Sequence, residues 1–160
     1  MLSALTTFTK IHVVISLIGI FAGFVIAFGL LTRRRLDGWT AIFLVMTLLT
    51  SVTGFFFPFH GFTPAIAVGI VSLVVLAVAI FARYGRKLNG AWRWIYVVSA
   101  MLALYLNFFV LIVQSFQKVP ALKALAPTQS EPPFQLAQLG ALVIFVVLTV
   151  FAAIRFRPVD

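Results

Sequence analysis

The chain has 160 residues, of which 63% are hydrophobic and only 9% are charged. A soluble domain is about 45–50% apolar and about 25% charged, so this composition excludes an ordinary soluble protein and predicts a membrane protein. The formal net charge is +9, but the basic residues lie in short segments beside apolar ones, which argues against nucleic acid as a partner.

Five segments are apolar enough and long enough to cross a bilayer, for which a helix needs about 20 residues. No segment between them is long enough to fold alone, so residues 1–160 are predicted to form one domain. We therefore expect an all-α integral membrane protein, a compact bundle of five transmembrane helices. The predicted spans are Ile11–Leu31, Trp39–Phe59, Pro64–Ala82, Trp94–Phe116 and Phe134–Ile154.

The first span carries its small and polar residues on one helical face. His12, Ser16, Gly19, Gly23 and Ala27 follow one another at steps of three or four residues. Lipid gives no hydrophobic drive for helix association, so small residues that permit close approach mark a packed face. Gly19 and Gly23 are therefore predicted to contact another helix, and His12 is predicted to point into the bundle.

The second and third spans are predicted to form a tight hairpin around His60. Thr63 can cap the third span, and Pro64 suits a first helical position. Gly54 is expected to pack in the second span and Gly69 in the third. The third span has few other polar or small residues, so we expect it to face lipid more than the others do.

The fourth span carries Asn107 and Gln114 at helical spacing, and the fifth begins with Gln135 and Gln138 on one face. An unpaired amide in hydrocarbon costs several kcal/mol, so these side chains must find partners. The connection between the two spans, residues 117–133, contains four prolines around good helix formers. We expect a short amphipathic helix there, lying on the outer surface.

The basic residues predict the orientation. Nine of the twelve fall on one side of the five-span arrangement, and Lys10, Lys118 and Lys123 fall on the other. Basic loops stay in the cytoplasm, which places the N-terminus outside and the C-terminus inside. The expected location is a bacterial-type inner membrane.

The polar residues within the spans gather in the outer half of the predicted bundle. A ligand-binding site is therefore predicted there, roofed by residues 117–133. Its candidate residues are His12, Ser16, His60, Asn107, Gln114 and Gln138.

Several functions fit this pattern. No span contains Asp or Glu, and no nucleophile–base set or phosphate-binding loop is found, so an enzyme is not favoured. The leading hypothesis is a non-catalytic subunit, assembly factor or small-ligand-binding module, with other membrane subunits or a second copy of the chain as candidate partners. One alternative is a redox protein in which His12 and His60 bind a b-type haem, or a metal together with Glu131. Another is a small oligomeric transporter or channel.

Overall fold

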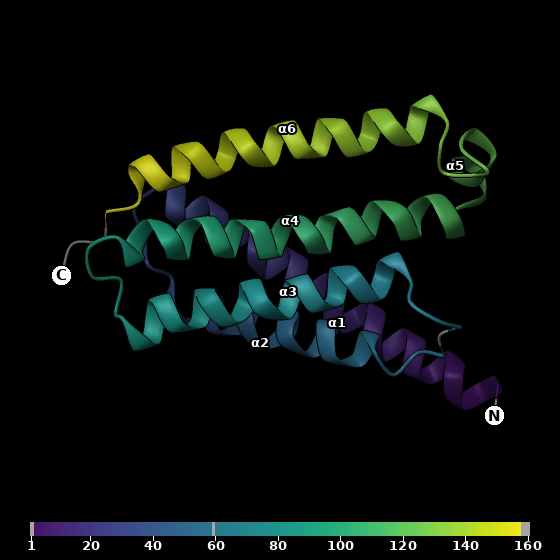
Figure 1. Cartoon of the computed structure of the whole chain (residues 1–160), viewed down its shortest axis with the longest axis horizontal. Coiled ribbons are helices and arrows are strands. Elements are labelled where there is room, and N and C mark those ends of the chain that lie inside the picture. The colour runs from purple at the N-terminus through teal and green to yellow at the C-terminus, as the bar shows by residue number, and fades with distance from the viewer. Residues whose placement is uncertain (1, 59, 158–160) are drawn as a thin grey trace.

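The computed structural model describes residues 2–58 and 60–157. All regular structure in these residues is helical, and Figure 1 shows the long helices lying side by side in an elongated bundle. The elements are α1 (Leu2–Leu31), α2 (Asp37–Gly54), α3 (Pro64–Ile80), the π-helical turn η1 (Phe81–Gly85), α4 (Trp92–Lys118), α5 (Pro120–Leu125) and α6 (Pro132–Arg155).

Five helices in the described chain are long and apolar enough to cross a membrane, as the sequence predicted. They are α1, α2, α3 with η1, α4 and α6. This composition indicates a membrane protein. The short helix α5 lies in the connection where an amphipathic helix was expected.

Two helices differ clearly in extent from the predicted spans. Helix α1 begins at Leu2 and not at Ile11. Helix α2 ends at Gly54, before the predicted Phe59, which lies outside the described residues. Pro58 explains the early end, because proline has no N–H to donate and disfavours helical geometry at the residue before it.

The two ends of the bundle differ in chemistry. Residues 32–36, 81–91 and 153–157 form one end, here called the arginine end. The opposite end, here called the α5 end, contains the start of α1, the connection between α2 and α3, and α5 (Figure 1). The main apolar core lies in the half toward the arginine end, and its members include Ala22, Ile26, Leu30, Phe43, Leu76, Tyr96, Leu104, Phe145 and Phe156.

Small residues let the helices approach closely in that half. A Cβ added to Gly23 would lie 2.4 Å from Cδ1 of Leu104 on α4 and 3.0 Å from the Phe43 ring on α2. A Cβ added to Gly19 would lie 3.3 Å from Cβ of Met46 on α2. Because real Cβ atoms do not approach as closely as 2.4 Å, this close contact is possible only with glycine at position 23, which has no side chain.

Helix α4 contacts α1, α3 and α6 and so lies at the centre of the bundle. Helix α6 is the least buried of the five membrane-length helices, which corrects the expectation that the third span would be the most lipid-facing. The reason is position: α3 packs between α2 and α4 and buries Ser72, Leu76 and Ala79, whereas α6 contacts α1 and α4 only on one side.

Both ends of the bundle have side chains that satisfy free backbone groups. The Arg93 guanidinium on α4 donates to the carbonyl oxygens of Ala153, at 3.2 Å, and of Phe156. These carbonyls lie at the C-terminal end of α6, where no following turn of helix supplies N–H donors. At the other end, the Thr63 hydroxyl accepts the N–H of Ile66 at 3.4 Å and caps α3, as predicted.

Replacing Gly23 with Ile tests the close approach of α1, α2 and α4. Gly23→Ile should lower the unfolding free energy in detergent by about 1–3 kcal/mol, because the new side chain overlaps Leu104 and Phe43. Gly140 on α6 is the matched control, since a Cβ there has no neighbour within 4 Å. Gly140→Ile should leave the thermal midpoint unchanged or raise it. Equal midpoints for the two variants would contradict the packing described for Gly23.

Candidate functional site

A cavity of about 500 Å³ lies toward the α5 end, between α1, α2, α3 and α4. Small-molecule sites in proteins have volumes of about 300–1,000 Å³ and mostly apolar walls with a few polar groups. This cavity fits that description. Its apolar wall includes Val13, Leu17, Ile20, Phe55, Val68 and Val110.

The early end of α2 shapes the wall of the cavity. After Gly54 the chain leaves the helix, and the Phe55 ring folds over Gly69 of α3, where an added Cβ would lie 2.8 Å from Cζ of the ring. An added Cβ at Gly54 would have only Cε1 of His12 as a neighbour, at 3.8 Å. The two glycines therefore leave the space that aromatic side chains and His12 border.

His12 is held in place by Thr53 on α2. The Thr53 hydroxyl is hydrogen-bonded to Nδ1 of His12 at 2.7 Å and lies 2.6 Å from the Leu49 carbonyl oxygen. The Phe57 ring meets the imidazole edge-on, with 5.1 Å between ring centroids. Ser16 also lines the cavity, but its hydroxyl donates to the His12 backbone carbonyl at 2.7 Å.

Three buried polar side chains from three helices lie along the cavity at its deep end: Ser51, Ser72 and Asn107. Asn107 donates from Nδ2 to the Thr47 hydroxyl at 3.2 Å. Its carbonyl oxygen, and the hydroxyls of Ser51 and Ser72, have no hydrogen-bond partner among residues 2–58 and 60–157. These groups are accessible from the cavity, so a molecule inside it can bond to them.

The mouth of the cavity lies near the C-terminal end of α4. Lys118 is exposed there, and Gln114 lies one turn deeper. The Gln114 amide has no hydrogen bond to any other described residue. From Asn107 to Lys118, α4 rises by about 16 Å along its axis.

The cavity brings together four of the six predicted ligand-binding residues: His12, Ser16, Asn107 and Gln114. Gln138 does not line it, because this side chain donates from Nε2 to the Phe109 carbonyl at 3.2 Å, where α6 meets α4. His60 is exposed in the connection between α2 and α3 and does not line the cavity either.

The predicted metal site combined His12 and His60 with Glu131, and the predicted haem site used the two histidines. No group of three His, Cys, Asp or Glu side chains gathers in the part of the chain that the structure describes. Glu131 accepts the Thr128 hydroxyl at 2.7 Å and the Thr128 N–H at 3.1 Å. These bonds lower the pKa of the Glu131 carboxyl, and the bond from the Thr128 hydroxyl has the largest effect. The carboxylate closes the turn before α6 and is exposed.

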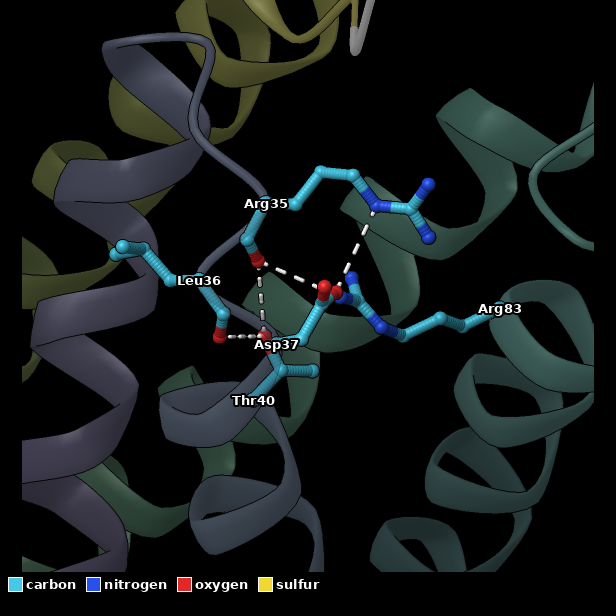
Figure 2. Close-up of polar contacts among 5 residues, drawn as sticks. All are labelled: Arg35, Leu36, Asp37, Thr40 and Arg83. Atoms are coloured by element: carbon cyan, nitrogen blue, oxygen red, sulfur yellow. Dashed lines mark hydrogen bonds and ion pairs between the residues drawn. The ribbon is translucent and has the colours of Figure 1, made fainter. Parts of the chain in front are cut away.

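A second polar cluster lies at the arginine end, and nothing in the sequence beyond its general charge predicted it. Figure 2 shows Arg83 of η1 reaching the first turn of α2, where it forms an ion pair with Asp37 and donates to the Arg35 carbonyl at 3.4 Å. Nearby, the Thr40 hydroxyl donates to the Leu36 carbonyl at 3.0 Å (Figure 2). The cluster joins α2 to the end of α3.

The Arg83 side chain is only 2% exposed, whereas that of Asp37 is 73% exposed. Its guanidinium carbon lies 5.2 Å from the centroid of the buried Tyr96 ring, within range of a cation–π contact. Its Nη1 and the Tyr96 hydroxyl are buried without a hydrogen-bond partner among the described residues. Because η1 is a widened turn, Ala82 and Arg83 both face inward from consecutive positions.

Comparison with protein-family models, with curated proteins and with solved structures finds no match to this chain.

The unequal burial of Arg83 and Asp37 predicts unequal effects of removing them. Asp37→Ala should lower the unfolding free energy by about 1–3 kcal/mol, because it leaves a buried guanidinium without its counterion. Arg83→Met should cost less, since it keeps the apolar stem and leaves Asp37 in water. The two variants can be compared by thermal unfolding in detergent. A larger loss for Arg83→Met would contradict this account of the ion pair.

Proposed function

We propose that this chain is a non-catalytic, small-ligand-binding protein of a bacterial-type inner membrane, and that the cavity between α1, α2, α3 and α4 holds the ligand. The proposal depends on one observation. Ser51, Ser72 and Asn107 have polar groups without a hydrogen-bond partner among the described residues, at the deep end of a mostly apolar cavity. Such groups are costly unless something in the cavity bonds to them.

A purely structural role accounts for these residues less well. A hydroxyl with a purely structural role bonds within the protein, as that of Ser99 does to the Ile95 carbonyl and that of Thr149 does to the Phe145 carbonyl. Among the described residues, Ser51 and Ser72 have no such bond, and Asn107 has one, from an N–H to the Thr47 hydroxyl. Their free groups come from three different helices and border one space, which is the arrangement of a ligand site.

The chemistry of the lining favours binding over catalysis. Among the described residues, no carboxylate lines the cavity, and His12 is the only histidine that does. The Ser16 hydroxyl donates to a backbone carbonyl and not to the His12 ring, so the two do not form a nucleophile–base pair. Thr50 and Ser115 likewise donate to the carbonyls of Met46 and Leu111 in their own helices.

The orientation is part of the same proposal. Three basic segments, at residues 33–35, 83–87 and 155–157, lie at the arginine end of the bundle. Basic loops stay in the cytoplasm, so this end is the cytoplasmic one. The cavity then opens in the outer leaflet, at the α5 end.

Asn107→Leu tests whether the cavity is occupied. Native mass spectrometry of the protein, purified gently from its own membrane, should show a small-molecule mass that the variant loses. Gln138→Leu is the matched control, because it removes an amide that bonds α4 from outside the cavity. Both variants should lose on the order of 1 kcal/mol of stability, and only Asn107→Leu should lose the ligand. Absence of any bound mass in the unmodified protein would leave Asn107 with a structural role alone.

The orientation can be tested separately with reporters. A reporter fused after Arg157 should show cytoplasmic activity, and a cysteine introduced at Phe62, in the exposed α2–α3 connection, should react with an impermeant thiol reagent added outside the cell. The reporter follows the last helix and the cysteine lies in a connection, so neither change alters a helix. Periplasmic activity of the fused reporter would reverse the orientation and place the cavity in the inner leaflet.

A further inference from the structure

The mouth of the cavity carries one unbalanced positive charge. Of the described residues that line the cavity, Lys118 is the only one with a formally charged side chain, and it is exposed. The ion pairs found in the described part of the chain both use Asp37, which lies at the arginine end. Glu131 is already bonded to Thr128 and Ser130. Lys118 therefore has no counterion among these residues.

His12 lies in the lining with Lys118. One ring nitrogen of His12 is bonded to Thr53, and the other has no hydrogen bond to a described residue. The lining thus contains a cation and an imidazole, and no carboxylate from the described residues that would repel a negative charge.

The deep end of the cavity favours an uncharged polar group instead. Asn107, Ser51 and Ser72 are uncharged and offer hydrogen bonds about 16 Å below Lys118. Between the two ends the wall is mostly apolar, formed by residues such as Leu17, Val68 and Val110, and Gln114 is a polar residue one turn below Lys118. A ligand that satisfies all three regions is negatively charged at one end, apolar in the middle and polar but uncharged at the other end.

Resting on the proposed binding function, we infer that the ligand is an apolar-bodied organic acid. Its carboxylate lies at the mouth beside Lys118, and a hydroxyl or carbonyl group at its far end bonds to Asn107, Ser51 and Ser72. A simple fatty acid provides the carboxylate for Lys118, but its methyl end would leave the deep polar groups unpaired. A long-chain alcohol or diol provides a hydroxyl for the deep groups but no carboxylate for Lys118.

Three chain-matched probes separate these contributions: 12-hydroxydodecanoate, dodecanoate and 1,12-dodecanediol. Their affinities are measured by equilibrium binding to the full chain in lipid nanodiscs, with empty nanodiscs subtracted. The hydroxy acid should bind most tightly. Lys118→Ala should weaken binding of both acids by about tenfold and leave the diol unchanged, since a hydrogen bond to a charged group is lost only for the acids.

Two variants serve as controls for the charge. Lys118→Arg should restore acid binding. Lys123→Ala removes a basic residue of the same side that lies on α5 and outside the cavity, so it should change nothing. Asn107→Leu should remove the preference for the hydroxy acid over dodecanoate while leaving dodecanoate binding in place.

The outcomes distinguish this inference from the proposed function. If the diol binds as tightly as the hydroxy acid, or if Lys118→Ala weakens all three probes equally, the acid assignment is wrong while a ligand-binding cavity stands. If no probe binds the unmodified protein, the acid assignment is also wrong. In that case the presence or absence of a bound mass on the native protein decides the proposed function independently.

Discussion

The close approach of α1, α2 and α4 at Gly23 is the contact on which the rest of the bundle depends. Between lipid-exposed helices there is no hydrophobic gain to drive association, so van der Waals contact between closely spaced helices must supply it. Gly23 permits that contact because it has no side chain, and Leu104 and Phe43 occupy the space that one would need. The buried alanines at positions 22, 27, 100, 103 and 152 extend the same dense packing through the half of the bundle toward the arginine end.

This dense half lets the other half stay open. Toward the α5 end, α2 stops at Gly54, and Phe55 folds against Gly69, so a cavity takes the place of an apolar core. The unpartnered groups of Ser51, Ser72 and Asn107 cost stability there. A bundle stabilised mainly at one end can tolerate that cost at the other, which is how binding sites are commonly accommodated in stable folds.

The arginines contribute more than a charge asymmetry. Arg93 bonds the last carbonyls of α6, and Arg83 is buried between α2, η1 and the Tyr96 ring. Each joins two membrane-length helices at the arginine end, next to the apolar core. Positive charge at this end therefore closes the bundle, while the single lysine at the mouth of the cavity has no such partner in the described residues.

The sequence alone determined the five apolar helices, the packed face of α1 from His12 to Ala27, and the inward position of Asn107, because hydropathy and helical periodicity are local properties of the chain. It could not assign Gln138 to the α6–α4 contact or His60 to an exposed connection, since both depend on which helices are neighbours. The pairing of Asp37 with Arg83 joins residues 46 positions apart and is set by the widened turn of η1. Only the tertiary structure could decide these features and the cavity, because each arises from the relative rotation and spacing of helices, which no single segment encodes.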